Sequence, residues 1–175
     1  MKILQNRMIA VILCAVMILG ASFAGAAGSL RALRAQSETV FELGVQRDLG
    51  EIAAQCYNIT QIARNYLPED DPGVAVVLQK REALIYAVTP GEKHRVAGEL
   101  VGAANALRHT LERQALSGQD LTLLQKCVVN IDSGLAIIAN DPYNEAAADF
   151  NRALGGFPAN FLGPLTGVTP LELYQ

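Results

Sequence analysis

The sequence is poor in the residues that build metal sites and disulfide scaffolds. It holds two histidines, three cysteines and no tryptophan among 175 residues. Two histidines cannot supply a histidine-rich metal site, and Cys14, Cys56 and Cys127 allow at most one internal disulfide, which excludes a small scaffold stapled by several bridges. We therefore expect neither a metal nor a cofactor.

Positive charge is also scarce. The formal net charge is −3, which argues against nucleic acid as a partner. After residue 28 the chain carries 12 basic and 17 acidic residues, a mildly acidic body that has no general attraction to anionic lipid. Hydrophobic residues make up 51% of the chain, which excludes disorder and is enough for the core of one domain, expected over residues 29–175.

One long stretch has no charge at all. Residues 8–28 (MIAVILCAVMILGASFAGAAG) form a run of 21 uncharged residues, preceded by Lys2 and Arg7. A bilayer-spanning helix needs about 20 apolar residues, so residues 1–28 are expected to be a single-pass cell-membrane anchor whose residues 8–28 contact the lipid bilayer. The alternative is a signal peptide cleaved after the small residues 24–26, which would release a periplasmic or secreted protein.

Small residues line one side of this run. Gly20, Ala24 and Gly28 are spaced four apart, which places them on one helix face where a second helix can approach closely in lipid. A homo-oligomer formed through this face stays open as an alternative to a monomeric anchor.

Beyond the apolar run, hydrophobic residues recur at intervals of three and four over long windows, which predicts an all-α fold. The spacing favours an antiparallel bundle of four to five helices that continues from the transmembrane helix. The row of hydrophobic residues that would face the bundle core, called the seam below, occurs in three segments: Leu49, Ile52, Cys56, Ile59, Ala63 and Tyr66; Ala97, Leu100, Ala104, Leu107 and Leu111; and Leu121, Leu124, Val128, Ile131, Leu135 and Ile138.

Capping signals divide the chain between these segments. Thr89, followed by a proline and by Glu92, predicts a capping box, and Asp71 and Asp141 each precede a proline that suits the first turn of a helix. A turn is expected at residues 44–47. The expected helices cover residues 4–43, 48–66, 73–88 and 90–116 as one arm broken at Thr89, 119–139 and 142–154.

Sites for common reactions are missing from the pattern. A di-iron carboxylate bundle needs Glu-x-x-His pairs, and neither His94 nor His109 belongs to one, so both are interpreted as solvated helix residues. Cys56 and Cys127 are interpreted as small buried hydrophobes rather than as a redox pair. Because no phosphate-binding loop or serine elbow is present either, we expect no enzyme.

The C-terminal third carries the most specific pattern. Tyr143-Asn144 is echoed by Phe150-Asn151 seven residues later. We interpret the aromatic rings as packing at the bundle end and the amides as bonded within the fold, with a partner-binding face as the alternative. The tail is expected to fold back onto the bundle through four apolar side chains, Phe161, Leu162, Leu165 and Tyr174.

In order and spacing the sequence resembles the LemA family. The matching features are the apolar N-terminus, the segments at residues 30–34 (LRALR) and 63–67 (ARNYL), the two aromatic–asparagine pairs, Phe157-Pro158, and a Gly-x-x-Pro at residues 167–170. The chain departs from the family pattern at residues 140–142, where Asn-Asp-Pro inserts a break. The resemblance implies a membrane-anchored helical bundle of the bacterial envelope, a non-enzymatic interaction or scaffold protein with an unknown protein partner. It carries over no catalytic residue.

Overall fold

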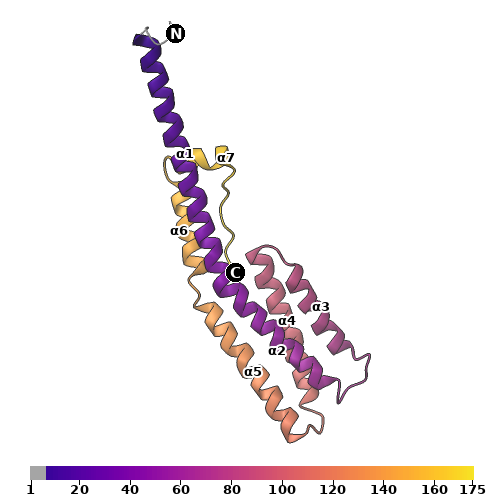
Figure 1. Ribbon diagram of the computed structural model, residues 1–175. Coiled ribbons are helices and arrows are strands. Elements are labelled where there is room, and N and C mark those ends of the chain that lie inside the picture. Colours follow the sequence, from indigo (N-terminus) through magenta and orange to yellow (C-terminus); the bar gives the residue numbers. More distant parts are fainter. Residues whose placement is uncertain (1–6) are drawn as a thin grey trace. The chain divides into compact units, whose positions relative to one another are not determined.

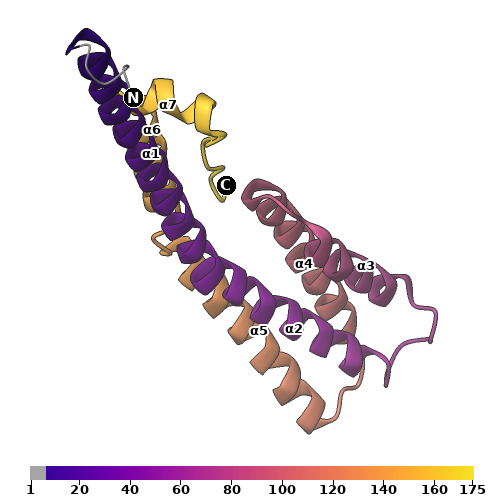
Figure 2. The same ribbon diagram turned by 45° about the horizontal axis from the view of Figure 1, so that its top comes forward.

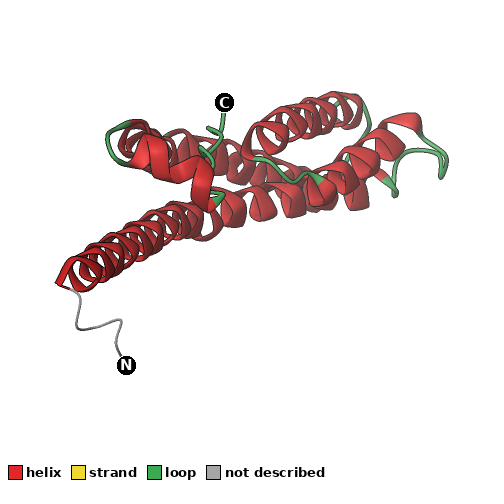
Figure 3. Ribbon diagram, turned by 90° about the horizontal axis from the view of Figure 1, so that it is seen from above, coloured by secondary structure: helices red, strands yellow, loops and turns green. Residues whose placement is uncertain are grey.

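The structure, a computed structural model, describes residues 7–175, and all of its regular elements over that range are helices, which confirms the all-α part of the prediction (Figure 3). Lys2 and the expected helix start near residue 4 lie outside the described residues. The elements are α1 (Arg7–Phe41), the π-helical η2 (Glu42–Gln46), α2 (Arg47–Ala63), α3 (Pro72–Tyr86), α4 (Pro90–Leu111), α5 (Gly118–Ala139), α6 (Tyr143–Gly155) and α7 (Ala159–Thr166).

The predicted turn at residues 44–47 is wrong, because α1, η2 and α2 form one continuous helix, Arg7–Ala63. Phe41 and Arg47 both have right-handed helical dihedrals, and the wider π turn between them accommodates the local irregularity without ending the helix. A lone glycine costs a helix only about 1 kcal/mol, too little to end one. Gly44 instead makes room for a neighbour, since a Cβ there would overlap the carboxylate of Asp141.

The predicted caps of α3 and α4 are present. Asp71 accepts hydrogen bonds from the backbone N–H groups of Gly73 and Val74, and Thr89 accepts one from the N–H of Glu92 (3.2 Å). The Glu92 carboxylate accepts from Val88, one residue before the cap. These bonds satisfy N–H groups that the first turn of a helix leaves without partners.

The expectation of one arm over residues 73–116 is wrong. α3 packs against α4, so the two form a hairpin that reverses at residues 87–89. Lys80 of α3 and Glu99 of α4 form an ion pair across it (Nζ–Oε2, 2.6 Å). Ala87 and Thr89 have extended backbone dihedrals, so the helix ends before them and the chain reverses direction between α3 and α4.

The chain divides into two compact units, residues 1–38 with 146–171, and residues 39–145 with 172–175. In the second unit, α2 packs against α3, α4 and α5 (Figures 1 and 2). The seams predicted in α2 and α4 are buried, except that Tyr66 is half-buried. The largest fully buried side chains of this unit include Val45, Leu49, Ile52, Ile59, Val77, Leu100, Leu107, Leu111 and Leu124.

The seam predicted for α5 is partly wrong. Leu121 and Leu135 are exposed, and the buried face instead runs through Leu124, Cys127, Ile131 and Ile138. Gly134 lies on the buried face of α5, and a Cβ there would stand 2.9 Å from Cγ1 of Ile52. α2 and α5 therefore approach closely at this glycine. The spacing of hydrophobic residues could not indicate this, because glycine does not count as hydrophobic in the pattern.

In the first unit, the buried side chains come from α1, from α6 and from the segment after α7. They are Ala27, Leu30, Ser37, Ala147, Phe150, Leu154, Val168 and Leu171. Of the four side chains expected to hold the tail, Phe161 and Leu165 are 68% and 61% exposed, so the expectation is wrong for these two, whereas Leu162 is half-buried. The side of α7 that packs inward is Gly163, whose lack of a Cβ admits Leu154.

Two helical stretches are long and apolar enough to cross a membrane by length and composition. The first lies at the start of Arg7–Ala63, with a mean hydropathy of 2.5 over its most apolar window, none of which is buried. The second, within Gly118–Gly155, reaches only 1.4 and is partly buried. Since α5 supplies core side chains to the second unit, the N-terminal stretch is the stronger candidate span.

Candidate functional site

The aromatic–asparagine pattern lies on α6. Tyr143, Ala147, Phe150 and Leu154 are all buried, at 2%, 0%, 4% and 7% exposure, and they recur at intervals of four and three along the helix. This spacing places them on one face, so α6 buries a continuous apolar stripe. The two asparagines each follow an aromatic member of the stripe and lie at its edge.

Asn151 binds the backbone of the C-terminal tail through both ends of its amide. Its Nδ2 donates to the carbonyl oxygen of Leu171 (2.8 Å), and its Oδ1 accepts from the N–H of the same residue (2.7 Å). One side chain therefore satisfies both backbone groups of a tail residue that belongs to no helix.

Asn144 repeats this arrangement on Tyr174. Its Nδ2 donates to the Tyr174 carbonyl oxygen (3.0 Å), and its Oδ1 accepts from the Tyr174 N–H (2.8 Å). Seven residues of helix advance about 10.5 Å, and three residues of extended chain advance about 10 Å. This match of lengths explains why asparagines seven apart on a helix suit tail residues three apart.

Aromatic rings surround the end of the tail. The Tyr143 hydroxyl donates to the carbonyl oxygen of Glu172 (2.5 Å), and its ring packs edge-on against Phe41 with centroids 4.8 Å apart. The ring of Tyr174 meets His94 edge-on at 4.9 Å, and burial raises the pKa of its phenol to about 12. The four predicted residues, Tyr143, Asn144, Phe150 and Asn151, thus hold the tail or fill the core.

A second polar constellation was not predicted. The Tyr66 hydroxyl donates to Asp120 Oδ2 (2.5 Å) and accepts from the backbone N–H of Ser117 (3.0 Å). Ser117 in turn caps α5 by accepting from the N–H of Asp120. The tie between Tyr66 and this cap spans about fifty residues, so it depended on the fold and had no local signal in the sequence.

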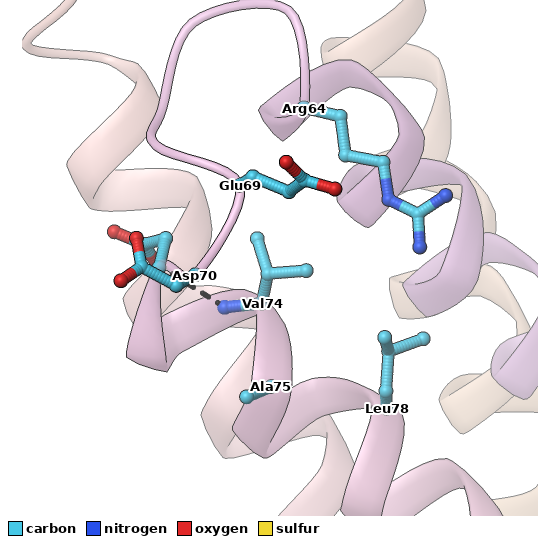
Figure 4. A pocket seen from close by; sticks show the side chains of 7 residues that line it. Arg64, Glu69, Asp70, Val74, Ala75 and Leu78 are labelled. Carbon is cyan, nitrogen blue, oxygen red and sulfur yellow. Dashed lines mark hydrogen bonds between the residues drawn. The ribbon is translucent and has the colours of Figure 1, made fainter.

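The acidic loop before α3 borders a groove of about 810 Å³ lined by Arg64, Glu69, Asp70, Asp71, Val74, Ala75 and Leu78. Figure 4 shows the side chain of Glu69 extending toward that of Arg64 across the groove. Asp71 has one oxygen committed to the cap of α3. Among residues 7–175, no three His, Cys, Asp or Glu side chains are grouped so as to hold a metal ion.

The histidines and cysteines lie apart from any reactive arrangement. His94 and His109 are exposed, and Nδ1 of His109 lies 3.0 Å from a Glu112 carboxylate oxygen. Cys56 and Cys127 are buried free thiols, whereas Cys14 is exposed on α1. Burial, followed by the nearby Cys127, raises the pKa of Cys56 to about 12, and burial also raises the pKa of Cys127.

We expect iodoacetamide at pH 8 to leave Cys56 and Cys127 of the folded chain unmodified until the chain unfolds, because thiolate is the reactive form and burial suppresses it. The raised pKa also makes the folded state hold a proton that the unfolded state loses above pH 9. Stability should therefore fall as pH rises from about 9 toward 12. Peptide mass mapping measures which thiols are modified. Denaturant titration of the parent chain and of Cys56→Ala at several pH values measures the loss of stability between pH 9 and 12. Labelling of Cys56 and Cys127 at the same rate in the folded and the unfolded chain would contradict the assignment.

Neither a scan against protein-family models nor a search of the curated proteins returns a match for the chain. The roles assigned to the α6 face and to the tail therefore rest on their contacts and burial.

Proposed function

We propose that the chain is a non-enzymatic, single-pass membrane protein of the bacterial envelope, an interaction or scaffold protein of LemA type. In this proposal, residues 8–28 cross the bilayer and residues 29–175 form an antiparallel bundle of four to five helices. The observation that carries it is the uneven burial of one continuous helix. Residues 11–25 of Arg7–Ala63 are exposed without exception, whereas α2 at its other end supplies core side chains.

The exposed part of α1 is too apolar to face water. Its large hydrophobic side chains leave about 40–70% of their area uncovered: Met8, Val11, Ile12, Leu13, Val16, Met17, Ile18, Leu19 and Phe23. Each buried methylene is worth about 0.8 kcal/mol, so nine such side chains in water would oppose solubility by several kcal/mol. A bilayer removes this cost, and 21 residues of helix are long enough to cross it.

The rest of the chain supports a binding role over a catalytic one. Ion pairs such as Arg95 with Glu99 and Arg152 with Asp149 lie at the surface, where they contribute little to stability and leave a charged exterior. Asn144 and Asn151 fasten the tail to α6, which fixes the shape of that surface. These features and the residue pattern shared with the LemA family favour a rigid body presented at the membrane.

A periplasmic or secreted protein released by cleavage is the second candidate. Residues 11–25 are exposed, and the first buried side chain of α1 is that of Ala27. A cut after Ala26 would therefore remove the apolar run without removing any core side chain. This candidate predicts a mature chain that starts at Ala27.

Membrane retention can be tested by fractionation with intact-mass measurement. We expect the full-length mass in the membrane pellet after alkaline carbonate washing. Val16→Arg combined with Leu19→Arg should release much of the chain, since each arginine at the centre of a span costs about 2.5–3.5 kcal/mol. The matched control is Val129→Arg on α5, where the valine is 64% exposed against 61% for Val16. A soluble product beginning at Ala27 would overturn the proposal in favour of cleavage.

A further inference from the structure

We propose that α7 is an interfacial helix that lies on the bilayer surface beside the emerging anchor, with Phe157, Phe161 and Leu165 inserted among the lipids. The partner of this apolar face is thus a lipid surface. The inference rests on the proposed membrane anchoring and adds a second contact to it.

Arginine side chains of α1 fix the position of α7 along the anchor. Arg31 Nη2 donates to the carbonyl oxygen of Thr166, the last residue of α7 (3.1 Å). Arg34 Nη1 donates to Thr169 at both its carbonyl oxygen (3.2 Å) and its hydroxyl (2.7 Å). Arg31 comes three residues after the apolar run ends at residue 28. α7 is therefore held at the level where the anchor leaves the hydrocarbon.

The outer face of α7 is apolar and uncovered. Phe161 and Leu165 lie four residues apart on α7 and are 68% and 61% exposed, and Phe157, in the turn that precedes the helix, is 91% exposed. The inner face is already used, because Gly163 is buried and a Cβ there would come within 2.8 Å of Leu154 Cδ1. Within the first unit, α7 thus has a packed side and an exposed side, and the exposed side carries Phe161 and Leu165.

The composition around α7 suits the membrane interface. Residues 153–171 contain no charged side chain, so nothing in this stretch opposes contact with lipid. Aromatic rings at the level of the headgroups are typical of membrane-proximal segments, and Arg31 supplies a cationic group at the same level for lipid phosphates, whereas Arg34 is ion-paired with Glu38 (2.8 Å). Figure 1 shows α7 beside α1, with the N-terminal part of α1 extending beyond it.

The absence of tryptophan allows a direct test, because each single-tryptophan variant has one reporter. The full chain is reconstituted into vesicles of phosphatidylcholine and phosphatidylglycerol with and without brominated acyl chains. Phe161→Trp reports on α7, Phe23→Trp on the apolar run, and Tyr86→Trp, at a 73% exposed position of α3, on the second unit. We expect bromine to quench Phe23→Trp and Phe161→Trp by at least twofold and to leave Tyr86→Trp unchanged.

The three reporters separate the two proposals. Quenching of Phe23→Trp with Phe161→Trp unquenched would overturn the interfacial role of α7 while anchoring stands. No quenching of Phe23→Trp would overturn the anchoring itself. A blue-shifted but unquenched Phe161→Trp would assign the face to a protein contact and also overturn the lipid assignment. Circular dichroism and a Tm equal to that of the parent chain establish that each variant folds.

Discussion

Ile131→Asp is expected to unfold the second compact unit. Ile131 is 5% exposed on the face of α5 that packs against α2, and Leu124, at 2% exposure, lies two turns earlier on the same face. An aspartate at either position would bury a carboxylate with no partner, or force the two helices apart to hydrate it. Either outcome costs several kcal/mol, against a total stability of about 5–15 kcal/mol for a domain. Thermal unfolding followed by far-UV circular dichroism should show no cooperative transition.

The matched control is Val129→Asp. Val129 lies two residues before Ile131 on the same helix but is 64% exposed, so its carboxylate would be solvated. Both substitutions lower helix propensity by nearly the same amount, so a difference in stability between the two variants measures the effect of burial. Equal loss of stability in both variants would show that α5 does not pack by the face described above.

Asn151→Ala should give the second largest effect, a loss of about 1–3 kcal/mol of unfolding free energy. The substitution deletes both hydrogen bonds to Leu171, which is itself 9% exposed, and leaves a backbone N–H and C=O without partners. Asn144→Ala should cost less, because its bonds to Tyr174 are exposed and water can replace them. For a chain of this size, 1 kcal/mol lowers Tm by roughly 2–4 °C, which calorimetry resolves.

Two further variants isolate the amide. Asn151→Asp keeps an acceptor for the Leu171 N–H but places a second acceptor against the Leu171 carbonyl oxygen, so it should destabilise about as much as Asn151→Ala. Asn105→Ala, at an exposed position of α4, is the propensity control and should be neutral or slightly stabilising. If Asn144→Ala and Asn151→Ala left Tm unchanged but abolished a cellular phenotype, the face with Tyr143 and Phe150 would become a partner-binding site.

Local signals in the sequence determined the helical elements. Spacing by three and four identified the buried faces of α2 and α4, since a helix repeats every 3.6 residues whatever it packs against. Asp71 and Thr89 marked helix starts because a cap is a contact between residues two or three apart. The uncharged run of residues 8–28 was likewise readable, because length and apolarity suffice to name a candidate span.

Signals that depend on distant neighbours were misread. Gly44 looked like a turn, yet it lies inside a continuous helix where it makes room for Asp141. Gly134 carried no weight in the periodicity, yet its contact with Ile52 rotates the buried face of α5 toward Cys127. In both cases the meaning of a missing Cβ came from a residue far away in the chain.

The C-terminal region shows the same division. The repeat of an aromatic residue and an asparagine seven positions apart was visible in the sequence, and it indicated a shared helix face. The partners of those amides, the backbone groups of Leu171 and Tyr174, are 20 and 30 residues away. Amide side chains bind any backbone within reach, so only the tertiary structure decided which segment they hold. It also decided that Phe161 and Leu165 face outward, because Gly163 on the opposite side of α7 is what packs inward.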